Sequence, residues 1–256
     1  MLMLELQELT RRFDDLVAVD RLDLAVPAGR LVGLLGANGA GKTTTLNMLT
    51  TMLQPTSGTA RVAGCDIRDD IMGVRRSLGY VPEHGAVYEG LTAREYLELA
   101  ALMHDLDPAV GLRRAERILA HFDLTDNLDG RLAGFSKGMR RKVLVTAALL
   151  HDPPVLFLDE PMDGLDVPSQ RRLAELLVQL AAGGKTVVYS SHILQQVEEI
   201  CEHLVLIHEG RLLWEGAVAD LRRDHDGAPL TDIFLRMTHQ DSDRSVAWAD
   251  LLGDGA

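Results

Sequence analysis

Short apolar runs alternate with helical periodicity along most of this chain. Residues 31–35 and 155–158 are unbroken apolar runs, which are typical of strands buried on both faces of a parallel sheet. The further strands predicted in this way are residues 78–81, 186–189, 204–207 and 211–214. The helices predicted between them are residues 42–52, 168–181 and 193–202. This alternation predicts an α/β fold around a mainly parallel sheet.

The N-terminal region departs from this alternation. Residues 3–9 and 18–26 have the pattern of short strands, and the second of them ends at the turn Pro27-Ala28-Gly29. Residues 59–62 resume a strand after the first predicted helix. We expect these strands to form an N-terminal antiparallel β subdomain beside the main sheet.

The stretch from about residue 88 to residue 145 has helical periodicity only. Its predicted helices are residues 93–103, residues 108–122 and a helix that opens near Ser136. Because the strands on either side belong to one predicted sheet, we interpret the stretch as a helical subdomain inserted into a single domain of residues 1–222. Residues 223–256 are polar and acidic, and we expect them to form a short C-terminal tail.

The composition narrows the possible classes of function. The chain has 256 residues, of which 46% are hydrophobic and 25% charged, as in ordinary globular proteins. A net charge of −12 argues against nucleic-acid binding through a basic surface. Nothing pairs the two cysteines, Cys65 and Cys201, so we expect reduced thiols in a cytoplasmic protein. No signal peptide or apolar run of about 18 residues is evident, so any membrane role would come from a partner.

A glycine-rich loop joins the strand at residues 31–35 to the helix that follows. Residues 36–43 have a glycine, four further residues and then Gly-Lys-Thr. Small residues let backbone N–H groups point at phosphate oxygens, and the helix presents its positive end to them. Lys42 would reach the β- and γ-phosphates of ATP, and the Thr43 hydroxyl would coordinate Mg²⁺. The predicted nucleotide-binding residues here are Gly36, Asn38, Gly39, Ala40, Gly41, Lys42, Thr43 and Thr44.

The alternative for this loop is a glycine-rich turn without a ligand. Its position between an apolar strand and a helix favours phosphate binding, but a phosphate loop alone is shared by kinases, GTPases and motors. Two carboxylates narrow the choice, because Asp159 and Glu160 directly follow the apolar run at residues 155–158. Asp159 would hold Mg²⁺ through water, and Glu160 would act as general base on the attacking water. An exposed strand end with a helix cap is the alternative for this pair.

A third motif, Phe-Ser-Lys-Gly-Met at residues 135–139, opens a helix upstream of these carboxylates. Here the chain resembles the ATP-binding cassette family, whose signature is usually Leu-Ser-Gly-Gly-Gln. Ser136 and Gly138 match the second and fourth positions, and the other three positions depart. Ser136 can cap the helix and offer its hydroxyl to the γ-phosphate, and Gly138 allows close backbone approach. Taken alone, Ser136 is equally well explained as a plain N-cap.

The resemblance extends over residues 3–222. Gly164-Leu165-Asp166 matches the family loop that lines the interface between two cassettes. His192 matches the switch histidine that contacts the γ-phosphate, although a lone histidine is more often structural. Phe13 occupies the place where the family stacks an aromatic ring on adenine, and the alternative is a core phenylalanine. The resemblance thus implies that Lys42, Glu160 and His192 carry catalysis.

One departure concerns the metal site. The family usually has glutamine after the strand at residues 78–81, and this chain has Glu83. The family glutamine ligates Mg²⁺ and senses the transporter partner. A carboxylate also ligates hard cations, but it adds negative charge near the phosphates. We therefore expect the metal ligands to be Thr43, Glu83 and Asp159.

The resemblance implies a membrane transporter's ATPase subunit, of the exporter type. Two copies would close head-to-tail as a homodimer, with each ATP between the phosphate loop of one copy and the signature of the other. Integral membrane subunits would dock near residues 83–88, which places the protein at the cytoplasmic face of the cell membrane. The alternative is a non-transport cassette ATPase in translation or DNA repair. Such proteins usually carry two cassettes, coiled coils or zinc modules, which this sequence lacks.

Overall fold

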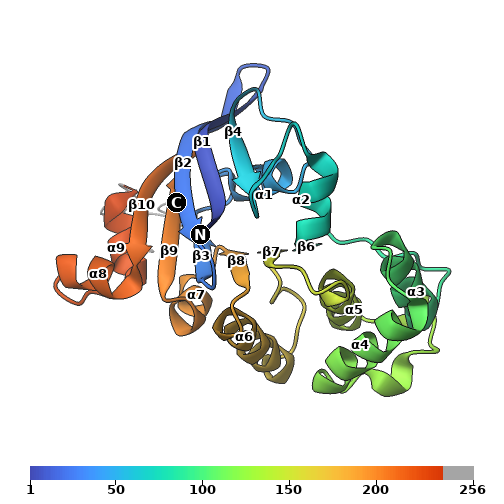
Figure 1. Ribbon diagram of the computed structural model, residues 1–256. Helices are drawn as coiled ribbons and strands as arrows, with labels where there is room; N and C mark the ends of the chain where they lie inside the picture. The colour runs from blue at the N-terminus through green and yellow to red at the C-terminus, as the bar shows by residue number, and fades with distance from the viewer. Residues whose placement is uncertain (239–256) are drawn as a thin grey trace, which may run out of the picture.

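Two sheets organise the fold, and the computed structural model describes them within residues 1–238 (Figure 1). The larger sheet has six strands in the order β10-β9-β3-β8-β7-β6. Its strands are β3 (Leu31–Leu35), β6 (Leu78–Val81), β7 (Val155–Asp159), β8 (Thr186–Ser191), β9 (His203–His208) and β10 (Arg211–Ala217). All pairs are parallel except the β9–β10 hairpin. Every residue of β3, β7 and β8 is buried, which explains the unbroken apolar runs at residues 31–35 and 155–158.

The smaller sheet contains the N-terminal strand, and its strands pair in antiparallel fashion. Its order is β2-β1-β4-β5, with β1 at Leu2–Phe13, β2 at Leu16–Pro27, β4 at Ser57–Val62 and β5 at Cys65–Asp66. Its inward face packs on helix α1 (Lys42–Leu49), and α1 in turn packs on the large sheet through one shared apolar core. The helix that follows the phosphate loop is therefore held between two sheets. The expected fold class is confirmed.

Helices cover the opposite face of the large sheet, at the bottom and left of Figure 1. They are α6 (Val167–Ala182), α7 (Leu194–Ile200), α8 (Val218–Asp224) and α9 (Leu230–Met237). Three residues of α9, Leu230, Ile233 and Phe234, are buried in this second core. The chain just after residue 223 therefore differs from the expected polar tail, because apolar residues three and four apart form one buried helical face. The rest of that expected tail, residues 239–256, lies outside the described residues.

In the sequence, a helical block separates β6 from β7, although these two strands are neighbours in the sheet. It contains α3 (Ala93–Met103), α4 (Pro108–His121) and α5 (Lys137–Leu149), with short 3₁₀ turns at Thr125–Asn127 and Leu132–Gly134. Its helices have strong start signals, such as the reciprocal capping of Thr92 and Glu95. The block has its own apolar core. Helix α5 belongs to both cores, since Val143 packs in the helical block and Val145 packs against the large sheet.

Helix α2 (Ile71–Ser77) and the two-residue strand β5 were not expected from the sequence. Val74 is the one buried residue of α2, so the helix has almost no apolar periodicity. Its start is set by Asp70, whose side chain accepts a hydrogen bond from the backbone N–H of Gly73. Such short elements depend on capping and on the sheet beside them.

Two histidines link the helical block to the large sheet. The rings of His104 and His151 stack with centroids 3.6 Å apart, and His151 Nε2 lies 2.9 Å from the carbonyl oxygen of Leu78. Burial, assisted by the neighbouring His104, lowers the pKa of His151 to about 4. At neutral pH the ring is neutral in the native protein.

We predict that His151 makes the folded state sensitive to acid. As pH falls below the ordinary histidine pKa of about 6.5, the unfolded chain binds a proton that native His151 rejects until about pH 4. The free energy of unfolding should therefore fall more steeply with decreasing pH in the wild type than in His151→Gln, which keeps a donor for Leu78. Urea unfolding across this range measures both slopes, and equal slopes would contradict the prediction.

Candidate nucleotide site

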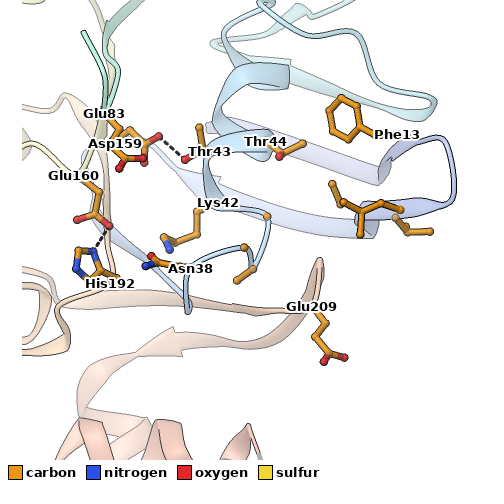
Figure 2. Close-up of a pocket in the computed structure, with 16 residues that line it drawn as sticks. Phe13, Asn38, Lys42, Thr43, Thr44, Glu83, Asp159, Glu160, His192 and Glu209 are labelled. Atoms are coloured by element: carbon orange, nitrogen blue, oxygen red, sulfur yellow. Dashed lines mark hydrogen bonds and ion pairs between the residues drawn. The ribbon is translucent and has the colours of Figure 1, made fainter.

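A cavity of about 740 Å³ opens at the carboxyl ends of β3, β7 and β8 (Figure 2). Parallel strands place their following loops at one edge, so residues far apart in the sequence meet there. The volume is that of a typical small-molecule site. The lining residues are Phe13, Leu16, Val17, Ala18, Asn38, Gly39, Ala40, Gly41, Lys42, Thr43, Thr44, Glu83, Asp159, Glu160, His192 and Glu209.

The glycine-rich loop forms the floor of this cavity between β3 and α1. Gly41 has a φ of +105°, and an added Cβ would lie 2.5 Å from the carbonyl oxygen of Ala18. The turn of the β9–β10 hairpin braces the loop from outside, because the Gly210 N–H donates to the carbonyl of Ala40 at 2.9 Å. The first turn of α1 follows directly, so its free N–H groups lie at the loop.

Lys42 is 7% exposed, although its ammonium lines the cavity. Its Nζ donates to the carbonyl oxygens of Gly36 at 2.7 Å and Ala37 at 3.2 Å. Burial lowers the pKa of Lys42, and the carboxylates of Glu160, Asp159 and Glu83 oppose that shift. The cavity therefore places one buried cation opposite three carboxylates.

Asp159 is fully buried at the end of β7, and both of its oxygens accept hydrogen bonds. Thr43 Oγ1 donates to Oδ2 at 2.7 Å, and Ser190 Oγ donates to Oδ1 at 2.8 Å. The residues that the structure describes contain no cage of three or more potential metal-ligating His, Cys, Asp or Glu side chains. Mg²⁺ commonly binds one or two protein oxygens together with substrate phosphates, so the Thr43–Asp159 pair fits this ion.

Glu160 and His192 meet at one side of the cavity (Figure 2). His192 Nδ1 lies 2.7 Å from Glu160 Oε1, and Ser191 Oγ donates to Glu160 Oε2 at 3.3 Å. Glu160 has a φ of +47°, which is uncommon for a residue with a side chain. The hydrogen bonds to its two oxygens orient the carboxylate of Glu160 toward the cavity, as Figure 2 shows.

The other two expected ligands lie at opposite ends of the cavity. Phe13 is 39% exposed, and the Arg11 guanidinium carbon lies 4.4 Å from its ring centroid, so this aromatic is a cavity wall and not a core residue. Glu83 lines the cavity beyond Asp159, and the distance from Glu83 Oε1 to His84 Nε2 is 3.8 Å. Figure 2 shows Phe13 and Glu83 on either side of the glycine-rich loop.

Ser136 and Gly138 do not line this cavity. Ser136 caps α5, and its Oγ accepts a hydrogen bond from the Met139 N–H at 3.2 Å. Gly138 packs tightly, since an added Cβ would lie 2.7 Å from the carbonyl oxygen of Gly164. The structure thus brings together in the cavity all expected site residues except Ser136, Gly138 and Gly36. The carbonyl oxygen of Gly36 accepts a hydrogen bond from Lys42.

Sequence reasoning missed several residues of the site. Leu16, Val17 and Ala18 line the cavity from β2, and Glu209 reaches its edge from the β9–β10 turn. Ser190 was given no role from the sequence, although its hydroxyl donates a hydrogen bond to Asp159. Buried hydroxyls at the end of an apolar strand were the one signal available, because a buried hydroxyl requires a hydrogen-bond partner.

Comparisons with known proteins agree on one family. The family model described as ABC transporter matches residues 19–163. The chain is 36% identical to the ABC transporter ATP-binding protein NatA of Bacillus subtilis (strain 168), over 91% of this chain and 97% of that protein. The chain belongs to the ABC transporter family.

Two further comparisons describe this family relationship. The cassette is 35% identical to the daunorubicin resistance ATP-binding protein DrrA3 of Streptomyces coeruleorubidus, over 90% of this chain and 72% of that protein. A solved ATP binding subunit of an ABC transporter has a TM-score of 0.86 to it at 34% identity, over 92% of this chain and 99% of that one. The resemblance inferred from the motifs is confirmed. Among the described residues of the cassette, no helix combines the length and apolarity that a membrane span requires.

We predict that Gly41→Ala destabilises the cassette and weakens ATP binding. A side chain at this φ costs about 1–3 kcal/mol, and the new Cβ would displace either the loop or Ala18. Urea unfolding measures the first effect, and titration with ATP the second. Gly90→Ala is the matched control, because an added Cβ there meets nothing within 4 Å. Equal behaviour of the two variants would contradict the assigned role of Gly41.

Proposed function

We propose that this chain binds and hydrolyses ATP as the motor subunit of an exporter-type ABC transporter. One observation carries the proposal: Lys42, the Thr43–Asp159 pair and the Glu160–His192 pair converge in one cavity. A phosphate cradle, a metal ligand pair and an oriented carboxylate are the components that phosphoryl transfer to water needs.

ATP lies with its phosphates over the glycine-rich loop and its adenine toward Phe13. The loop N–H groups and Lys42 neutralise the phosphates, and the first turn of α1 adds its positive end. Thr43 and Asp159 would hold Mg²⁺, with Glu83 as the third oxygen ligand, and the ion would supply positive charge against the phosphates. The aromatic ring of Phe13 and the apolar side chains beside it accommodate the base.

Glu160 acts on the attacking water as general base. Its carboxylate accepts the water's proton while the water oxygen attacks the γ-phosphorus and the bond to ADP breaks. His192 holds Glu160 Oε1 through Nδ1 and so fixes the direction of the carboxylate. The family resemblance assigns the other ring nitrogen of His192 to the γ-phosphate, and Lys42 stabilises the charge of the transferred group.

A second copy of the chain completes the site. Ser136 lies at the start of α5 outside its own cavity, with the positive end of a 13-residue helix behind it. An anion on a facing subunit suits this helix end. Head-to-tail closure of two copies places Ser136 and Gly138 of one on the ATP of the other, and hydrolysis releases the dimer.

Membrane subunits convert this closure into transport. Related ATP-binding proteins include one named for daunorubicin resistance, which supports export over a role in translation or DNA repair. The loop at residues 83–88 is where membrane subunits dock, because it leaves the cavity at Glu83 and leads into the helical block. The chain then lies on the cytoplasmic face of the membrane.

We predict that Glu160→Gln separates binding from hydrolysis. The amide cannot accept the water's proton, so turnover should fall by at least about a hundredfold. ATP affinity should change little, and gel filtration with ATP should show a stable dimer. Glu175→Gln is the control, since this carboxylate pairs with Arg171 on the surface of α6. Turnover of Glu160→Gln near the wild-type value would refute the role of general base.

A further inference from the structure

Arg141 is a buried cation that the expected chemistry does not use. It lies in α5, and the residue is 3% exposed. Within the described part of the chain, no carboxylate lies within 4 Å of its guanidinium nitrogens. Instead, Nη1 donates to the carbonyl oxygen of Pro82 at 2.7 Å and Nη2 donates to that of Glu83 at 2.6 Å. Burying an arginine is costly, so this two-pronged contact with backbone requires an explanation.

The two carbonyls belong to the loop that carries Glu83 into the cavity. That loop begins where β6 ends at Val81, and it leads into the helical block. Helix α5 also approaches β6 closely at its other end, because a Cβ on Gly79 would lie 2.1 Å from the carbonyl oxygen of Ala148. The helix therefore contacts the strand and the following loop at two separate points, and Arg141 makes the contact at the cavity end.

The charges around Arg141 connect it to the site. Burial lowers the pKa of the guanidinium, and the carboxylates of Asp163, Asp159, Glu83 and Glu160 act in the opposite direction. Three of these carboxylates line the nucleotide cavity. A positive group near them offsets part of the repulsion that Glu83 adds where the family usually has glutamine.

We infer that Arg141 is a positioning residue that sets the place of Glu83 at the metal side of the cavity, by clamping the carbonyls of Pro82 and Glu83 to α5. The inference rests on the proposed function, because Glu83 is there a magnesium ligand. It also links the two sites of the dimer. Ser136, which serves the partner's nucleotide, caps the same helix whose Arg141 holds the loop at the chain's own nucleotide.

Arg140 provides a matched comparison on the same helix. Its Nε donates to the carbonyl of Leu132 at 3.1 Å and its Nη2 to that of Ala133 at 3.0 Å. This contact also uses two backbone carbonyls, but they belong to a turn inside the helical block. Arg140 Nη1 also pairs with Glu89 at 2.9 Å. Arg140→Gln therefore removes the same charge and the same kind of contact, but it leaves the bonds to the carbonyls of Pro82 and Glu83 in place.

The experiment measures ATP binding with a fluorescent ATP analogue, with chelator present and across a Mg²⁺ titration. Arg141→Gln should raise the Mg²⁺ concentration at half-maximal effect by about tenfold, the cost typical of losing a group that orients a metal ligand. Affinity without Mg²⁺ should change far less than the Mg²⁺ midpoint, because Arg141 contacts no atom of the phosphate loop and acts on the phosphates through its charge alone. Arg140→Gln should leave both quantities unchanged.

A double-mutant cycle tests whether Arg141 acts through Glu83. In the Glu83→Ala background, Arg141→Gln should shift the Mg²⁺ midpoint no further, since the ligand it positions is already absent. Additive shifts would overturn the inference. The inference would also be overturned if Arg141→Gln lost ATP affinity equally with and without Mg²⁺ and unfolded at a lower urea concentration. That result would mean that Arg141 only stabilises the fold.

Arg141→Lys covers the case in which Arg141→Gln fails to fold. Lysine keeps the charge but loses the two-pronged geometry, so the Mg²⁺ midpoint should still rise. Failure of both variants to fold would assign Arg141 to the fold and overturn the positioning role. The proposed function fails separately, if the wild type shows no Mg²⁺-dependent ATP binding or hydrolysis. A normal wild type with an unchanged midpoint in Arg141→Gln refutes this inference alone.

Discussion

The burial of Lys42 beneath the end of the parallel sheet is the constraint on which the rest of the site depends. A buried ammonium is stable only where oxygen atoms surround it. The loop carbonyls of Gly36 and Ala37 supply two of these at hydrogen-bond distance, and the strand ends supply carboxylates nearby. The glycine-rich loop can turn its backbone toward the lysine because Gly41 adopts a φ that other residues rarely do.

Asp159 and Glu160 are each held by a hydroxyl from a neighbouring element. Asp159 accepts from Thr43 of α1 and from Ser190 of β8, so the helix, β7 and β8 are joined at one fully buried residue. Glu160, next in the chain, is oriented by Ser191 and His192 instead. Adjacent carboxylates thereby receive different environments, which is consistent with the different roles we propose for them: Asp159 as a metal ligand and Glu160 as the general base.

Helix α5 connects this site to the rest of the molecule. Its apolar residues pack in both the sheet core and the helical core, its N-cap is Ser136, and Arg141 holds the loop after β6. A displacement of the helical block therefore moves the Glu83 loop and the Ser136 end together. In the dimer that we propose, a rigid element shared by two cores would be a physical means by which closure at one nucleotide affects the other.

The sequence alone determined the sheet strands, most long helices and the two motifs that line the cavity. Buried parallel strands have unbroken apolar runs, and the phosphate loop requires its glycines and lysine at a local spacing, so both are visible without a fold. Local signals did not predict α2 or the buried face of α9, which depend on capping and on packing against distant elements.

Only the tertiary structure decided which expected residues share one site. Phe13, Glu83, Asp159 and His192 come from separate elements, and the carboxyl ends of the strands bring them to one cavity, while Ser136 stays outside. The same holds for Arg141, whose role depends on carbonyl groups 58 and 59 positions away. Backbone carbonyls carry no side-chain identity, so a contact of this kind leaves no pattern in the sequence and exists only where the chain folds back on itself.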